Sequence, residues 1–104
     1  ILVAGLWRSG GSSAGQLFVA RLDSAGGLDA GFGSGGVLLL DVPGLVDPVA
    51  DGIVLQGDGS IVVVGSGDAV SGEQGFLLRL TTDGDLDASF AEGGWRTIPN
   101  PDPN

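Results

Sequence analysis

The sequence predicts an all-β protein made of antiparallel strands. Two observations support this prediction. Short segments rich in Val, Ile, Leu and Phe alternate with turns containing Gly and Asp, and the whole pattern occurs twice. With 21 glycines among 104 residues, no window keeps a helical apolar spacing over ten or more residues.

The first copy of the pattern contains three segments with the length and boundaries of strands. They are residues 1–5 (ILVAG), 17–22 (LFVARL) and 37–41 (VLLLD). A long loop follows the first segment, and a glycine-rich stretch joins the other two. These features predict three short strands.

The second copy contains four such segments: residues 49–55, 61–65, 76–80 and 94–98. The stretch QGDGS, residues 56–60, joins the first two and contains Asp-Gly, a strong hairpin signal. In residues 18–36, ten of nineteen positions are identical to residues 76–94. The two copies therefore predict the same supersecondary unit.

The arrangement of these strands follows from their hydrophobic pattern. VLLL (37–40) and IVVV (61–64) are apolar on both faces, so we expect the sheets to be covered on both sides. Short antiparallel strands in such a repeat predict stacked four-stranded blades of a β-propeller. A β-sandwich and a β-solenoid are the alternative folds. The domains expected are 1–41 (three strands), 42–98 (four strands) and a Pro-rich tail or linker, 99–104.

Residues 58–90, DGSIVVVGSGDAVSGEQGFLLRLTTDGDLDASF, resemble the delta-60 repeat, a bacterial family of predicted β-propeller repeats. The resemblance covers residues 1–36 and 58–94. It departs at Ala91, where the family usually has Gly, and at Ala25, where an acidic or Asn-type turn residue is usual. The resemblance implies the propeller architecture and a secreted or cell-surface bacterial setting, without a defined activity.

Composition excludes several classes of function. The net charge is −9 and the chain has four arginines and no lysine, which argues against nucleic acid and anionic membrane surfaces. No apolar run approaches the roughly 18 residues of a membrane helix, so no insertion is expected. Without His or Cys, the chain cannot form Ser–His or Cys–His nucleophiles, nor imidazole or thiolate metal sites.

The chain begins within the repeat pattern, so we expect it to be a piece of a longer polypeptide or a processed product. Two blades cannot close a ring. The expected partners are therefore other repeats of the same polypeptide or other copies of this chain. Open strand edges could also recruit other chains, which makes self-assembly an alternative function.

Asp83, Asp85 and Asp87 alternate in a glycine-containing turn, a pattern that resembles the start of a calcium loop. In the first copy Ala25 and Gly27 replace the first two of them. The comparison favours a structural turn, and calcium remains an alternative in the second copy only. No other cofactor is expected.

The retained residues fit the structural interpretation. Gly26 and Gly84 can supply a turn with positive φ. Asp29 and Asp87 can accept backbone N–H bonds at that turn.

Arg21 and Arg79 lie within apolar strands, where a buried guanidinium needs a partner. We predict pairing with Asp29 and Asp87 respectively, because a structural pair recurs in every blade. An anion-binding or ligand-facing role is the alternative.

Three further features bear on ligands. GFGSGG (31–36) matches G-x-G-x-x-G, but a strand follows it rather than a helix, so it is not expected to bind phosphate. Trp7 and Arg8, placed in the long loop, could stack on a sugar or a surface protein, or pack beneath the loop. Trp95 begins a strand and is expected to pack.

We therefore expect a non-enzymatic propeller module that acts as a structural or interaction scaffold. A carbohydrate-binding, lectin-like propeller is the alternative. Paired carboxylates for glycoside hydrolysis are disfavoured, because nearly every Asp is adjacent to a turn Gly or Pro. A catalytic acid needs burial to raise its pKa.

Overall fold

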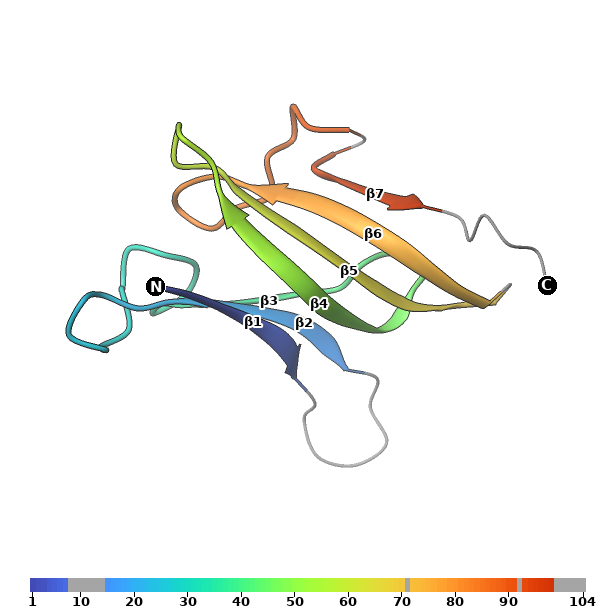
Figure 1. Ribbon diagram of the computed structural model, residues 1–104, viewed down its shortest axis with the longest axis horizontal. Helices are drawn as coiled ribbons and strands as arrows, with labels where there is room; N and C mark the ends of the chain where they lie inside the picture. The colour runs from blue at the N-terminus through green and yellow to red at the C-terminus, as the bar shows by residue number, and fades with distance from the viewer. Residues whose placement is uncertain (8–14, 71, 92, 99–104) are drawn as a thin grey trace.

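The computed structural model describes residues 1–7, 15–70, 72–91 and 93–98, and within these ranges the regular structure is all β-strand (Figure 1). The strands are β1 (Leu2–Trp7), β2 (Gln16–Arg21), β3 (Val37–Leu40), β4 (Val46–Leu55), β5 (Ile61–Ala69), β6 (Gly72–Leu80) and β7 (Trp95–Ile98). The all-β prediction is confirmed. The described ranges contain no helix with the length and apolarity to cross a membrane.

The strands form two antiparallel sheets, with orders β1-β2-β3 and β4-β5-β6-β7. Each strand pairs with its neighbour in the sequence, and the three-then-four strand count agrees with the prediction. The β5–β6 hairpin is longer than predicted, because its pairing continues to Ala69 opposite Gly72. The backbone ladder extends past the apolar residues from which the strands were predicted.

Strand β4 begins at Val46 rather than at residue 49, because its pairing with β5 continues to Val46 opposite Asp68. Two register shifts interrupt this pairing, one between Val46 and Val49 and one between Ala50 and Gly52. Asp47, with φ of 51°, lies in the first of them, as expected for a bulge. The predicted Asp-Gly hairpin is present: Gln56 N–H donates to Ser60 O at 2.8 Å, and Gly59 has φ of 90°.

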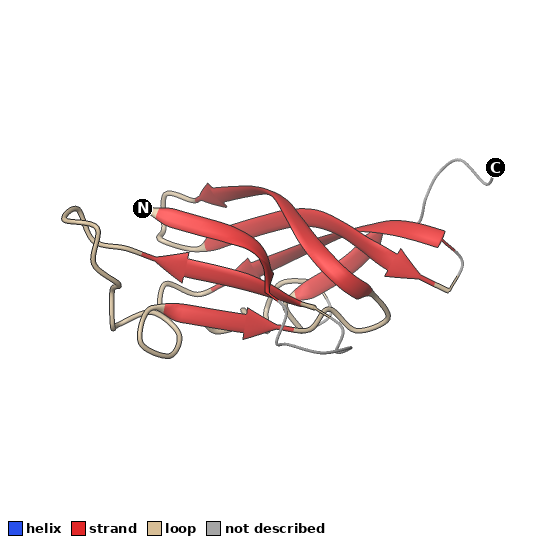
Figure 2. Cartoon of the chain, turned by 90° about the horizontal axis from the view of Figure 1, so that it is seen from below, coloured by secondary structure: helices blue, strands red, loops and turns tan. Residues whose placement is uncertain are grey.

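The hydrophobic core lies between the two sheets, which pack face to face (Figure 2). Strand β4 packs against β1 and β2. The buried residues of this core cluster are Leu17, Val19, Phe32, Val42, Ile61, Val63, Phe76, Leu78 and Leu80. Because side chains alternate along a strand, each sheet contributes one face to this core.

The expectation that both faces of each sheet are covered is wrong for the part of the chain that the structure describes, because each sheet there packs only on the other one. The second sheet packs on the first through a face that carries Val63, and we call this face proximal. The proximal face of the first sheet is the equivalent face, which carries Val3. The opposite face is the distal face, which carries Val19 in the first sheet and the equivalent Leu77 in the second.

Candidate functional site

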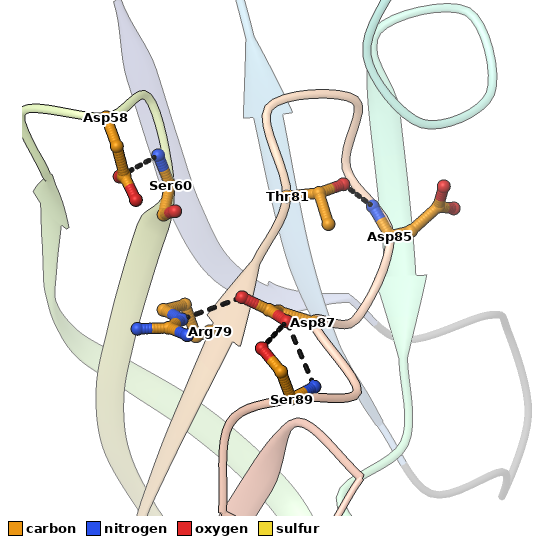
Figure 3. A network of polar contacts seen from close by, with 7 residues as sticks. All are labelled: Asp58, Ser60, Arg79, Thr81, Asp85, Asp87 and Ser89. Atoms are coloured by element: carbon orange, nitrogen blue, oxygen red, sulfur yellow. Dashed lines mark hydrogen bonds and ion pairs between the residues drawn. The ribbon is translucent and has the colours of Figure 1, made fainter.

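A polar cluster at the end of β6 joins Arg79 to Asp87 (Figure 3). Arg79 Nε donates to Asp87 Oδ2 at 2.9 Å, and Asp87 N–H donates back to Arg79 O at 2.9 Å. The other carboxylate oxygen, Oδ1, accepts from Ser89 N at 3.1 Å and from Ser89 Oγ at 2.6 Å. The cluster thus closes the turn that follows the strand.

The first repeat contains the same cluster. Arg21 Nε donates to Asp29 Oδ2 at 2.9 Å, and Asp29 N–H donates to Arg21 O at 2.9 Å. Asp29 Oδ1 accepts from Gly31 N at 3.0 Å. The pairing expected from the sequence is therefore present in both repeats, although the side chains are only half-buried.

Each guanidinium also lies over a phenylalanine ring. Arg21 Cζ is 5.0 Å from the centroid of Phe32, and Arg79 Cζ is 4.9 Å from that of Phe90. These distances are within the range of a cation–π contact. Each arginine therefore connects a strand, a turn aspartate and an aromatic ring.

Hydrogen bonds in these turns keep the carboxylates ionised. The Ser89 hydroxyl and amide lower the pKa of Asp87, and Arg79 lowers it further. The Gly31 amide, helped by Arg21, lowers the pKa of Asp29.

The pKa of another turn aspartate, Asp58 in the β4–β5 hairpin, is also lowered. The Ser60 amide lowers the pKa of Asp58, and the Ser60 hydroxyl adds to the effect. Such groups are acceptors held as anions, the opposite of a general acid.

The two repeats meet where the second-repeat turn docks on the first-repeat cluster. Arg21 Nη1 donates to Thr82 O at 2.6 Å, and Gly33 N–H donates to Asp83 O at 2.8 Å. Gly84 is buried, and a Cβ added there would lie 2.7 Å from Gly33 N. Arg21 and Gly33 of the first repeat thus form a docking site for the glycine turn of the next repeat, and we call this docking site the receptor.

Residues 56–90, about a third of the chain, match a family model described as "Domain of unknown function (DUF5122) beta-propeller". The two sheets are β-propeller blades. Searches of curated proteins and of solved structures each found no match. The matched segment runs from the β4–β5 hairpin to Phe90, so it contains the Arg79–Asp87 cluster within one blade.

The turn glycines of the two blades have the expected conformation. Gly26 has φ of 89° and Gly84 has φ of 92°. Each donates its amide across the turn at 3.1 Å, to Asp23 O and Thr81 O respectively. This geometry agrees with the turn interpretation of the alternating aspartates.

Two of the three calcium candidates, Asp83 and Asp85, form hydrogen bonds through their backbone atoms. Asp83 O accepts from Gly33 N–H, Asp85 O accepts from Thr81 N–H at 2.7 Å, and both side chains are exposed. The Asp87 carboxylate is held by its arginine and serine. Among the described residues, no group of three or more acidic side chains is placed to hold a metal ion. Calcium binding by the second copy stays an alternative prediction.

Among the aromatic candidates, Trp7 is the last residue of β1, so its predicted position in the loop is wrong. The β1–β2 pairing extends to Trp7 opposite Gln16, further than the apolar run suggested. Arg8 and the tail, 99–104, lie outside the described residues. Trp95 starts β7, is half-buried and packs against the core.

The glycine-rich loop of the first blade, residues 31–36, leads into strand β3, as expected. Two backbone amides of this loop donate hydrogen bonds to carbonyl groups of the protein. Gly33 donates to the second blade, and Gly36 donates to Phe32 O at 2.8 Å. The loop is part of the receptor between blades.

Two participants in the contact between the blades, Gly33 of the receptor and Thr82 of the docking turn, could not be found from the sequence. They act through a backbone N–H and a carbonyl oxygen, which every non-proline residue possesses. The available signal was indirect. A turn glycine and its arginine recur at one spacing in both repeats.

Proposed function

We propose that this chain is a non-enzymatic β-propeller repeat module of the delta-60 kind, which acts as a structural and interaction scaffold. One observation carries the proposal: the Arg–Asp–Phe cluster occurs in both blades with the same geometry. A ligand site is usually built once, whereas a structural contact is needed in every repeat. The conspicuous charged side chains are therefore assigned to blade construction.

The electrostatics of the turns favour the same proposal. Glycoside hydrolysis needs one carboxyl with a raised pKa to protonate the leaving group. Hydrogen bonds lower the pKa values of Asp29, Asp58 and Asp87, which suits permanent acceptors.

The test is a combined assay of the chain for turnover and for glycan binding. A scaffold is expected to show no hydrolysis of glycoside or ester substrates above a buffer blank. It should also show no saturable binding across a broad glycan panel. Turnover lost in a single Asp→Asn variant would overturn the proposal in favour of a hydrolase. Saturable binding lost in Trp7→Ala but kept in Trp95→Phe would replace it with the lectin-like alternative.

We further propose a secreted or cell-surface bacterial setting, which the delta-60 resemblance supports. Immunoblotting of medium, surface and cytosolic fractions from the source cell tests this. The chain is expected in the medium or surface fraction, and confinement to the cytosol would contradict the proposal.

A further inference from the structure

The distal face of the first blade packs on the proximal face of the second blade. The equivalent proximal face of the first blade and distal face of the second blade lie on the outer sides of the pair. Val63 is 0% exposed, whereas its first-blade equivalent Val3 is 42% exposed. On the distal side, Phe32 is fully buried and its second-blade equivalent Phe90 is only half-buried. The first blade thus leaves a proximal face uncovered, and the second leaves a distal face uncovered.

The polar receptor is also present twice but filled once. In the first blade, Arg21 Nη1 and Gly33 N–H hold the carbonyls of the next turn. The second-blade equivalents, Arg79 Nη1 and the Ala91 amide, have no acceptor in the described part of the chain. The matching turn, residues 24–26 of the first blade, is exposed.

Backbone strain at Ala91 supports a use for this second receptor. Ala91 has φ of 49°, close to the 56° of Gly33, although left-handed backbone costs a residue with a Cβ about 1–2 kcal/mol. At Gly33 this conformation presents the amide to the turn of the next blade. Ala91 keeps the same conformation, although its amide has no acceptor among the described residues.

We propose that two copies of this chain associate head to tail. The 24–26 turn of one copy docks on Arg79, Phe90 and Ala91 of the other, and the uncovered proximal face packs on the uncovered distal face. The occupant follows from the contact between the blades, because this chain carries both halves of that contact on opposite ends. The inference deepens the proposed scaffold role and rests on it.

The contact between copies should be weaker than the one within the chain. Gly75 and Arg96 stand on the second distal face where the first has Leu17 and Leu38, so less apolar surface is buried. Each copy also carries a net charge of −9. Association should therefore strengthen with protein concentration and with salt, which screens the repulsion.

Sedimentation velocity over a wide concentration range, at low and high salt, tests the proposal. Gly26→Asn alters the docking turn, where a side chain has open space in the single chain but would meet the receptor in the assembly. Val64→Glu places a charge on the uncovered distal face, where Val64 is exposed. Each is expected to weaken self-association about tenfold to a hundredfold.

Two controls match these variants. Gly44→Asn changes a glycine with φ of 85° and open space around it, and Val70→Glu changes an exposed valine at a hairpin tip. Both are expected to associate like the wild type.

A mixture of the two variants gives the most specific readout. Gly26→Asn keeps an intact distal face and Val64→Glu keeps an intact docking turn. An equimolar mixture should therefore form a dimer and nothing larger, which also shows that both variants are folded. A wild type that stays monomeric, or variants that associate as the wild type does through open strand edges, would overturn the proposal. Either result leaves the scaffold role standing, whereas enzymatic turnover would end that role without changing the mass distribution.

Discussion

The two blades share one local structure and differ in their surroundings. Gly26 and Gly84 have nearly the same φ, yet the first is exposed and the second is buried against the other blade. Phe18 is half-buried and its equivalent Phe76 is 1% exposed. The turn and the cluster are therefore properties of the repeat, whereas burial depends on which neighbour is present.

This difference predicts that equivalent substitutions have unequal costs, and the largest contrast is in the core. Phe76→Ala is expected to lower the free energy of unfolding by about 3–5 kcal/mol, because the cavity forms between the sheets. Phe18→Ala should cost about 1–2 kcal/mol, since its ring is already partly in water. Urea denaturation at low protein concentration measures both. Equal losses would mean that the two faces are equally covered in solution.

The turn glycines give the next contrast. Gly84→Ala is expected to cost about 1–2 kcal/mol for its left-handed backbone and about 1–3 kcal/mol more for crowding Gly33. Gly26→Ala should cost only the backbone part, because nothing lies within 4 Å of its added Cβ. The same denaturation experiment measures both. A Gly26 variant as unstable as the Gly84 variant would contradict the open environment of the first turn.

Substituting the two arginines separates the pair within a blade from the contact between blades. Arg79→Met loses the ion pair with Asp87, whereas Arg21→Met loses its ion pair and the hydrogen bond to Thr82 O. We expect Arg21→Met to lose about 1 kcal/mol more than Arg79→Met. The difference in urea midpoint at equal m-value measures it, and equal losses would show that the bond between blades contributes nothing.

Lowering the pH should weaken both blades. Hydrogen bonds in the turns lower the pKa values of Asp29, Asp58 and Asp87 below the ordinary value of an aspartate, so the folded state binds protons less readily than the unfolded state. Their contribution to stability is complete above that value and is lost as pH falls through the lowered pKa values. Thermal melts between neutral and strongly acidic pH should therefore show the melting temperature falling below about pH 4. A triple Asp→Asn variant should flatten this dependence, and an unchanged profile would contradict the assigned acceptor roles.

Calcium should have the smallest effect. The Asp87 carboxylate is already bonded to Arg79 and Ser89, so a cation would have to compete with them. We expect the same melting temperature with calcium as with magnesium, in the wild type and in Asp85→Ala. A calcium-specific rise that disappears in Asp85→Ala would establish the calcium alternative in the second copy.

Local features were predictable because each depends on residues close in the sequence. The Asp-Gly hairpin, the turn glycines and the pairing of each arginine with the aspartate eight positions later follow from spacing and residue type. The start of β4 was less predictable. Its bulge places Asp47 in a left-handed conformation, and Asp47 Oδ1 accepts from Gly15 N at 2.6 Å, a partner in the other blade.

By itself, the sequence determined the strands, their antiparallel pairing and the repeated cluster, because each of these depends on local periodicity, turn chemistry and charge. Only the tertiary structure decided which copy of each face is buried. Equivalent residues such as Val3 and Val63 have the same local pattern, and the difference arises from the sheet packed against one of them. The contact of Gly33 and Thr82 with the neighbouring blade was likewise settled by packing, since it uses backbone atoms that every non-proline residue carries.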